Sequence, residues 1–181
     1  QTDSIPDKTK WGVCKKGSPA WSKYLSESYD QAYVHDGKLV LVAEKVNGVY
    51  KTGGVQSLGK AEFQYGKIEI CARFTKTAKG GWPAIWMMPA KPVYSGWPAC
   101  GEIDIMEHVG NNQNVILSTL HYPGHSGGNG NTASKTYANV STEFHVYKLI
   151  WRPTSVKTYV DDDLLHSVAN DGSLPFNSDF F

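Results

Sequence analysis

The sequence lacks the features that mark membrane, nucleic-acid-binding and helical proteins. No apolar run approaches the ~20 residues that a membrane-spanning helix needs. The 18 basic and 17 acidic side chains nearly cancel, and this balance favours neither nucleic acid nor an anionic membrane as a partner. Helical periodicity is not sustained over a typical helix length, and there is no internal repeat. A chain of 181 residues with this pattern predicts one β-rich domain.

Cysteine is also scarce, since Cys14, Cys71 and Cys100 are the only three in the chain. An odd number leaves at least one thiol unpaired unless it bonds to another chain. Their spacing matches no metal-binding template. We expect three unpaired, partly buried thiols, with one disulfide as the alternative.

Short alternating segments, glycine and large aromatic side chains are plentiful instead. Many short strands separated by turn residues indicate a sandwich or a barrel. One helical turn is expected at 20–25, and a long loop rich in Gly, Ser and Asn at 123–138. The expected strands, apart from the acidic segment below, are 29–34, 38–44, 49–57, 63–74, 82–88, 115–122, 144–152, 155–160 and 164–168.

The segment 101–110 carries three carboxylates within six residues, separated by large apolar side chains. Side chains alternate between the two faces of a strand, so Glu102 and Asp104 share one face. Strict alternation sends Glu107 to the opposite, apolar face. One extra residue at Met106, a β-bulge, returns Glu107 to the side of the other two acids, and bulges are frequent beside active sites.

Two carboxylates with unequal roles are what glycoside hydrolysis requires. A third acid between them, Asp104, would separate the proton affinities of its neighbours. The alternative is an acidic edge strand whose carboxylates are simply solvated. Tryptophan favours the first interpretation, because Trp82, Trp86 and Trp97 precede the acids and indole faces suit sugar rings.

These segments resemble glycoside hydrolase family 16, and more closely its bacterial laminarinase and mixed-linkage β-glucanase branch. The resemblance extends from about Gly12 onward. The matching segments, in the order of the family, are Gly53-Gly54-Val55-Gln56-Ser57, Phe63-Gln64-Tyr65-Gly66-Lys67-Ile68-Glu69, Trp82-Pro83-Ala84-Ile85-Trp86-Met87-Met88, Trp97-Pro98, Glu102–Glu107 and Phe144-His145-Val146-Tyr147.

The resemblance implies an all-β jelly roll of two antiparallel sheets, with the acidic strand on a concave, substrate-binding sheet. Residues 1–181 would form a single catalytic domain. The family continues beyond the point matched by Phe181 with further strands, so we expect an incomplete chain whose remainder was cleaved off or is supplied as a separate fragment. We also expect a secreted, periplasmic or cell-surface protein whose signal peptide has been removed.

The resemblance assigns Glu102 as nucleophile and Glu107 as acid/base in a retaining mechanism, with Asp104 hydrogen-bonded to Glu102. A retaining site places its two carboxyl groups ~5–5.5 Å apart. His121 would contact the sugar beyond the cleaved bond or steady Glu107, with a purely structural histidine as the alternative. His108 follows Glu107 directly and should point the other way.

Further sugar contacts are expected at Trp97, Trp82 and Trp86, with at least one of the last two packed in the core instead. Glu69 matches a family glutamate that faces the substrate. Its usual arginine partner is replaced here by Cys71, and Arg73 on the same face would take its place. The alternative for Glu69 and Arg73 is a surface ion pair of little energetic value.

The predicted function is a secreted endo-β-glucanase that cuts β-1,3- or mixed β-1,3/1,4-glucan with retention. Two alternatives remain: a family relative of the agarase or carrageenase type, and a non-catalytic glucan-binding module. No cofactor and no metal at the catalytic site are implied. A structural calcium occurs in some family members, but the sequence shows no loop signature for one.

Overall fold

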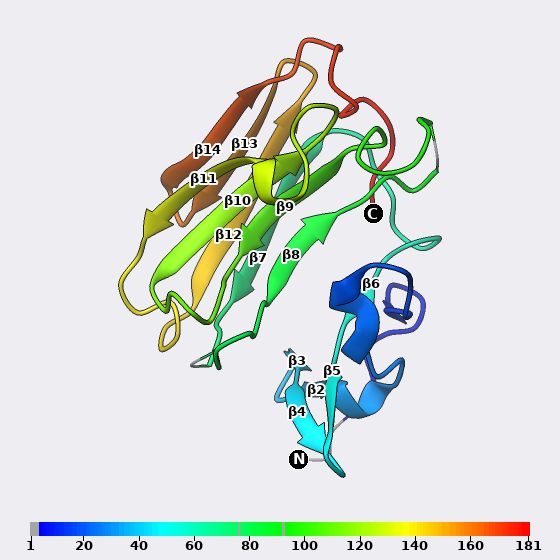
Figure 1. The fold of residues 1–181 in the computed structure, drawn as a ribbon, viewed down its shortest axis with the longest axis vertical. Helices are drawn as coiled ribbons and strands as arrows, with labels where there is room; N and C mark the ends of the chain where they lie inside the picture. The colour runs from blue at the N-terminus through cyan, green and yellow to red at the C-terminus, as the bar shows by residue number, and fades with distance from the viewer. Residues whose placement is uncertain (1–3, 76, 92) are drawn as a thin grey trace. The chain divides into compact units, whose positions relative to one another are not determined.

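A computed structural model describes residues 4–75, 77–91 and 93–181. Its regular elements are β-strands and three short 3-10 helices, as the all-β prediction requires. The chain divides into two compact units: unit 1 comprises the residues up to Glu62 with Phe181, and unit 2 comprises Phe63–Phe180 (Figure 1). No helix in the described ranges has the length and apolarity to cross a membrane. The single catalytic domain stays a prediction.

Unit 1 is built from three antiparallel strand pairs, β1–β6, β2–β3 and β4–β5. The β2–β3 hairpin turns at Asp36 and Gly37, which both have positive φ, so the predicted turn is confirmed. Gly53 follows β5, and only glycine fits there, because a Cβ would lie 1.8 Å from the Gln31 carbonyl oxygen. The elements of unit 1 are β1 (Gly12–Val13), η1 (Ala20–Tyr24), η2 (Tyr29–Gln31), β2 (Ala32–His35), β3 (Lys38–Leu41), β4 (Ala43–Val46), β5 (Val49–Thr52) and β6 (Val55–Gln56).

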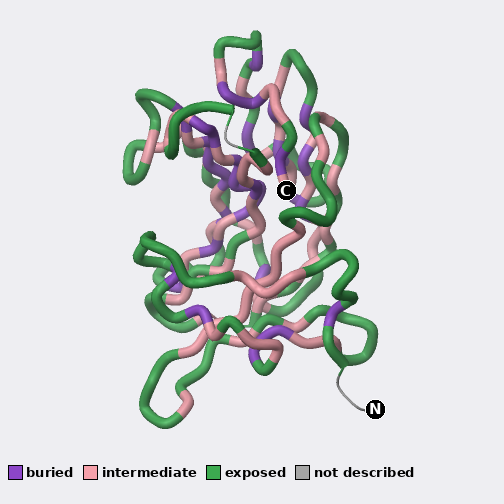
Figure 2. The backbone as a smooth tube through the Cα atoms, turned by 90° about the vertical axis from the view of Figure 1, so that its right-hand side faces the viewer, coloured by how far each residue is buried: buried purple, intermediate pink, exposed green. Residues whose placement is uncertain are grey.

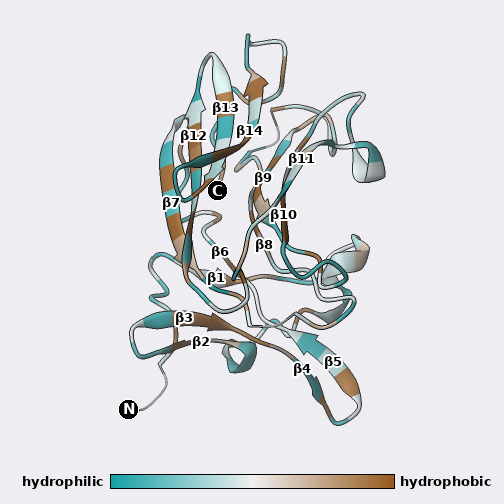
Figure 3. Cartoon of the chain, turned by 90° about the vertical axis from the view of Figure 1, so that its left-hand side faces the viewer, coloured by the Kyte–Doolittle hydropathy of each residue, from teal (hydrophilic) through white to brown (hydrophobic). Residues whose placement is uncertain are grey.

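Unit 2 contains two four-stranded antiparallel sheets that face each other (Figure 3). The acid sheet has the order β11-β10-β9-β8, with β8 (Ala84–Met87), β9 (Glu102–Glu107), β10 (Val115–His121) and β11 (Asn131–Thr136). The back sheet has the order β14-β13-β12-β7, with β7 (Gly66–Ala72), β12 (His145–Arg152), β13 (Ser155–Val160) and β14 (Asp163–Ala169). This is the predicted sandwich of two antiparallel sheets.

The predicted loop at 123–138 is wrong in part, because it contains η3 (Gly127–Asn129) and the strand β11. β11 pairs with β10 over six residues, from Leu120 opposite Asn131 to Val115 opposite Thr136. The segment reads Asn-Thr-Ala-Ser-Lys-Thr and its side chains are mostly exposed. An edge strand of this kind has no apolar alternation from which it could be recognised.

The core of unit 2 lies between the two sheets, and Figure 2 shows that the buried stretches of the backbone gather there. A segment near the C-terminus contributes to it: Phe180 exchanges two backbone hydrogen bonds of 3.0 Å with Phe63, and the Asp179 carbonyl accepts one from Ala90. The buried members are Met87, Ile103, Ile105, Met106, Ile116, Leu120, Tyr122, Val140, Tyr147, Leu149, Trp151, Val156, Val160, Phe176 and Phe180. The inward faces of β9 and β10 are thus fixed by packing, and their outward faces are free for other roles.

All three cysteines are free thiols, so the disulfide-free prediction is confirmed. Burial raises the pKa of the Cys14 thiol to about 11 and also raises the pKa of Cys100. Cys71 is exposed rather than partly buried, because its position on β7 faces away from the core.

Candidate active site

A β-bulge interrupts β9 in the middle of the acidic segment. Opposite β8, Met106 pairs with Ile85 and Asp104 pairs with Trp86, so Ile105 has no partner of its own. Ile105 and Met106 are consecutive, yet both are buried in the core, at 2% and 0% exposure. The predicted bulge is confirmed, with its extra residue one position before the expected one. The bulge returns the next residue to the outward face of the sheet.

Two features of the backbone hold the acidic strand in place. The Ser118 hydroxyl, fully buried on β10, donates a 2.8 Å hydrogen bond to the Asp104 carbonyl beside the bulge. Gly101, at the start of β9, has φ +82°, and a Cβ there would lie 3.1 Å from Pro175. Only glycine combines that conformation with so close an approach. The backbone conformation of Gly101 therefore helps to set the position of Glu102, the next residue.

Glu107 lies on the outward face of the acid sheet and both its oxygens accept hydrogen bonds. The indole Nε1 of Trp82 donates to Oε1 at 3.0 Å, and the Thr119 hydroxyl donates to Oε2 at 2.7 Å. Thr119 is the register partner of Asp104, so without the bulge its hydroxyl would not face Glu107. We use the name acid face for this outward surface, on which Glu102, Asp104 and Glu107 lie.

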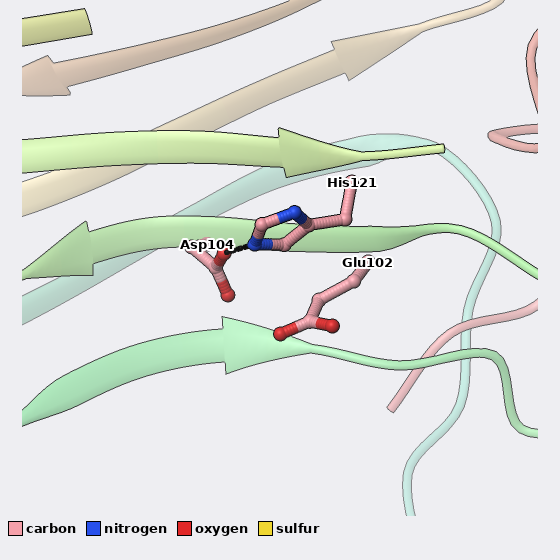
Figure 4. A group of neighbouring side chains, drawn as sticks. All are labelled: Glu102, Asp104 and His121. Carbon is pink, nitrogen blue, oxygen red and sulfur yellow. Dashed lines mark ion pairs between the residues drawn. The ribbon is translucent and has the colours of Figure 1, made fainter. Parts of the chain in front are cut away.

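Glu102, Asp104 and His121 form a cluster at the other end of the acid face (Figure 4). His121 is the cross-strand partner of Glu102, and its Nε2 lies 3.4 Å from Asp104 Oδ2. Trp97 reaches in from the preceding loop: its Nε1 donates to Glu102 Oε2 at 2.5 Å, and its ring lies 5.5 Å from the His121 ring. Glu102 is thus held by the Trp97 indole, whereas Asp104 faces His121 with an Oδ2 that has no hydrogen-bond partner.

Burial makes this carboxylate pair hold protons more tightly than free side chains do. Burial first, and then the charge of Asp104, raises the pKa of Glu102 to about 7. Burial first, and then the charge of Glu107, raises the pKa of Asp104 to about 8. Both carboxyl groups therefore hold a proton to a higher pH than free side chains do, and they titrate as an interacting pair.

The same cluster is where a cation would find ligands. Within the described ranges, one group of metal-capable side chains is found, Glu102, Asp104 and His121, whose ligand atoms all lie within 4.8 Å of one another. Two carboxylates and an imidazole suit a divalent transition metal. The absence of a metal from the reaction stays a prediction.

The three tryptophans predicted to contact sugar all lie outside the core. Trp82 and Trp97 are 64% and 48% exposed and donate to Glu107 and Glu102. Trp86 is half-buried and is the register partner of Asp104, which places it on the same outward face. The expectation that Trp82 or Trp86 packs in the core is wrong, because Ile85 and Met87 take the inward positions of β8.

Glu69 and Arg73 are not brought to the acid face, which corrects their predicted place beside the acids. β7 belongs to the back sheet, and Ile68 and Ala72 occupy its core-facing positions. Glu69 therefore points outward, where it pairs with Lys67 at 2.7 Å and with Lys148 at 3.7 Å. The Arg73 guanidinium instead lies 5.2 Å from the Phe144 ring.

His108 and Thr119 complete the comparison with the sequence. His108 is fully buried, stacks on Phe74 at 5.3 Å and contacts the Val115 carbonyl through Nδ1, so its predicted inward orientation is confirmed. The role of Thr119 was not predicted. Alternation along β10 does place it on the same face as His121, and this is the signal that identifies it.

The buried acids predict an unusual pH dependence of stability. Because the pKa values of Glu102 and Asp104 are raised on folding, the folded state binds more protons than the unfolded state between about pH 4 and about pH 8. Stability from these groups is complete below that window and is lost as the pH rises through it. Asp104→Asn, which cannot ionise, should therefore lose less stability than the wild type between about pH 5 and about pH 8.

Urea unfolding at both pH values measures this. Asp163→Asn is the matched control, because Asp163 is exposed and its pKa is lowered by the hydrogen bond from Lys135. The Asp163→Asn protein should therefore lose as much stability as the wild type between the two pH values. If the stability of the Asp104→Asn protein depended on pH as that of the wild type does, Asp104 would not be a buried carboxyl group with a raised pKa.

Comparison with known proteins agrees with the geometry. Residues 21–179 match the family described as glycosyl hydrolases family 16. The chain is 41% identical over 172 residues to a keratan-sulfate endo-1,4-beta-galactosidase of Sphingobacterium multivorum, covering 90% of this chain and 40% of that protein. It is 34% identical over 179 residues to a beta-glucanase of Rhodothermus marinus, covering 92% of this chain and 62% of that protein.

A solved structure shows the same fold. The laminarinase from Rhodothermus marinus superposes with a TM-score of 0.87 and 31% identity, over 99% of this chain and 79% of that chain. The predicted jelly roll is thereby confirmed. The chain spans less than two thirds of the length of the two curated relatives described above.

Proposed function

Because this chain belongs to glycoside hydrolase family 16, we propose that it is an endo-acting, retaining β-glucanase that cuts β-1,3- or mixed β-1,3/1,4-linked glucan. One observation carries the proposal: the bulge at Ile105 places three carboxylates on one face, where side-chain donors hold both Glu102 and Glu107. A solvated acidic edge strand would need no such partners. β9 is moreover an inner strand of its sheet, which disfavours that alternative.

In the first step, Glu102 attacks the anomeric carbon and Glu107 protonates the departing glycosidic oxygen. The indole N–H of Trp97 holds Glu102 in place, and the raised pKa of Asp104 limits the negative charge next to the nucleophile. The indole N–H of Trp82 and the hydroxyl of Thr119 aim Glu107. The products are a covalent glycosyl-enzyme and the released reducing-end fragment.

In the second step, water replaces that fragment. Glu107, now ionised, removes a proton from the water, which attacks the anomeric carbon and releases Glu102. Two inversions at the same carbon give net retention. The glutamate that acted as acid is restored to its starting protonation state.

The surroundings of the acids favour an uncharged polysaccharide. Of the described side chains that contact the three acids, none is a lysine or an arginine, which a sulfated chain would require as counter-charge. The exposed faces of Trp82 and Trp97 leave room for sugar residues on both sides of the cut bond. This openness supports endo cleavage. Secretion and independence from cofactors stay predictions.

A second candidate is an endo-β-galactosidase acting on keratan sulfate or a related galactan. The 41% identity to the Sphingobacterium multivorum enzyme favours it. It replaces the red-algal galactans as the galactan alternative with the most direct support. A non-catalytic glucan-binding module is disfavoured, because all three acids are present and side-chain donors hold both Glu102 and Glu107.

Incubation with laminarin, barley β-glucan, agarose and keratan sulfate separates these functions, with new reducing ends and oligosaccharide size as the readout. Cleavage of laminarin or barley β-glucan into mixed oligosaccharides is expected. Cleavage of keratan sulfate or agarose alone would establish the galactan alternative. Binding to a glucan with no new reducing ends would overturn both and support the module.

A further inference from the structure

A short chain of hydroxyl groups leads away from Glu107. The Thr119 hydroxyl lies 2.7 Å from Glu107 Oε2 and 3.1 Å from the hydroxyl of Thr132 on the neighbouring strand β11. The Thr132 hydroxyl in turn donates to the Gly130 carbonyl at 3.3 Å. Thr119 and Thr132 are register partners, so their side chains stand on the same face. The chain ends on a backbone acceptor that cannot change its protonation state.

The hydrogens of this chain can point in either direction. Each threonine hydroxyl has one hydrogen and two lone pairs. When Glu107 is ionised, Thr119 donates to its carboxylate. When Glu107 is protonated and no substrate is bound, its own hydrogen bonds to Thr119, Thr119 donates to Thr132, and Thr132 donates to the Gly130 carbonyl. When a glycosidic oxygen is bound, the hydrogen of Glu107 turns to that oxygen and Thr119 again donates to Glu107. Every hydrogen has an acceptor in both states, and no proton leaves Glu107 along the chain.

We propose that Thr119 is a positioning residue that holds Glu107 in one orientation through both of its protonation states. Thr132 accepts the hydrogen of Thr119 when that hydroxyl turns away from Glu107, and the Gly130 carbonyl accepts the hydrogen of Thr132. The proposal rests on the proposed function, in which Glu107 must act first as an acid and then as a base. A donor without a lone pair, such as the Trp82 N–H, can serve only as a donor in both states. The hydroxyl of Thr119, by contrast, can donate a hydrogen bond to Glu107 or accept one from it.

The end of the chain is fixed by a close approach of backbone to side chains. A Cβ at Gly130 would lie 2.6 Å from Thr119 Cγ2 and 2.7 Å from His121 Cε1. The φ of Gly130 is −57°, which any residue adopts, so glycine is needed here for space rather than for conformation. The loop before β11 can therefore press against Thr119 and set the direction of its hydroxyl.

The charged groups that face Glu107 are few. Asp104 lies on the same strand and its pKa is raised by burial and then by the charge of Glu107, while His121 on β10 faces Asp104. Glu102 lies further along β9. The neighbours from the other strands are uncharged: Trp82 and Trp86 before and on β8, and Thr132 on β11. A change at Thr119 therefore acts on Glu107 without removing a charge.

The test compares Thr119→Val, which keeps the shape and removes the hydroxyl, with Thr119→Ser, which keeps the hydroxyl. Thr119→Val should lower kcat about tenfold to a hundredfold with little change in KM, as expected for a lost hydrogen bond to a charged group. Thr119→Ser should recover most of the loss. Thr158→Val is the control, because the buried Thr158 hydroxyl has no hydrogen-bond partner.

A second readout does not depend on activity. Carbon-13 NMR titration of the Glu107 carboxyl should show its midpoint at higher pH in Thr119→Val, because the ionised form has lost a donor. It should be unchanged in Thr158→Val and largely restored in Thr119→Ser. An unchanged titration in Thr119→Val would overturn the proposal even if activity fell. A shifted titration in a protein that cuts no glycan would support the hydrogen-bond chain and refute the proposed function.

Discussion

Replacing Glu102 with glutamine should lower hydrolysis of the best substrate by at least about a thousandfold, because an amide cannot form the covalent glycosyl-enzyme. The side chain keeps its shape, and its carbonyl oxygen can still accept the hydrogen bond from the Trp97 indole. Binding of an oligosaccharide should therefore change little. Initial rates and calorimetric binding constants measure the two effects separately.

Glu69→Gln provides the matched control for this experiment. Glu69 is the glutamate that pairs with lysines on the outward face of the back sheet, and an exposed ion pair contributes little to stability. This variant should remain fully active. Full activity in Glu102→Gln, or an equal loss in Glu69→Gln, would refute the assignment of the nucleophile.

Removing Glu107 should give a different kind of loss. Glu107→Ala lacks both the acid and the base, and general acid–base catalysis contributes about 10²–10⁴-fold to rates. An aryl β-glycoside with a good leaving group needs no protonation, so it should still form the glycosyl-enzyme. Azide should then accelerate turnover and give a β-glycosyl azide, because it attacks the covalent intermediate from the face that water would use.

The corresponding Glu102→Ala variant is the counterpart for azide. There is no covalent intermediate in that protein, so azide entering the vacated space should give an α-glycosyl azide by a single displacement. Product configuration by NMR therefore assigns the two roles independently of rates. A β-azide from Glu102→Ala and an α-azide from Glu107→Ala would exchange the roles of the two glutamates.

The pH dependence of kcat/KM should reflect the raised pKa of Glu102. The nucleophile must be ionised in the free enzyme, so kcat/KM should rise as the pH increases toward about 7. Asp104→Asn removes the neighbouring charge that raises this pKa, while burial, the larger cause, remains. The acidic limb should therefore move part of the way to lower pH.

The bulge in the acidic strand could be predicted, because strict alternation would not place all three acids on one face. Alternation places Glu102 and Asp104 together and turns Glu107 away, and only a bulge reconciles the three with one site. The position of the bulge was missed by one residue. Ile105 and Met106 are both apolar and both fit the core, so the sequence does not reveal which of the two has no cross-strand partner.

The positions of Glu69 and Arg73 could not be predicted in the same way. Alternation along β7 separates its two faces correctly, but it does not say which sheet the strand joins. β7 pairs with β12, in which Lys148 lies opposite Glu69 and almost eighty positions further along the chain. Pairing over such a distance depends on the packing of the whole unit, which no local pattern records.

The tryptophans show a related limit. Large aromatic side chains on a strand are usually expected in a core, and this expectation failed for Trp82 and Trp86. Their inward neighbours Ile85 and Met87 fill the core positions, and the indole N–H of Trp82 finds its acceptor on Glu107. The acids and the indoles stabilise each other, so neither is understood from its own segment alone.

The most direct test of the account is the configuration of the first product. Proton NMR during hydrolysis of laminarin or barley β-glucan, recorded before mutarotation, reports the anomer released. Glu102 as nucleophile and Glu107 as acid/base on one face predict the β-anomer first, with the α-anomer growing in later. Release of the α-anomer first would show direct attack by water and contradict the covalent role of Glu102.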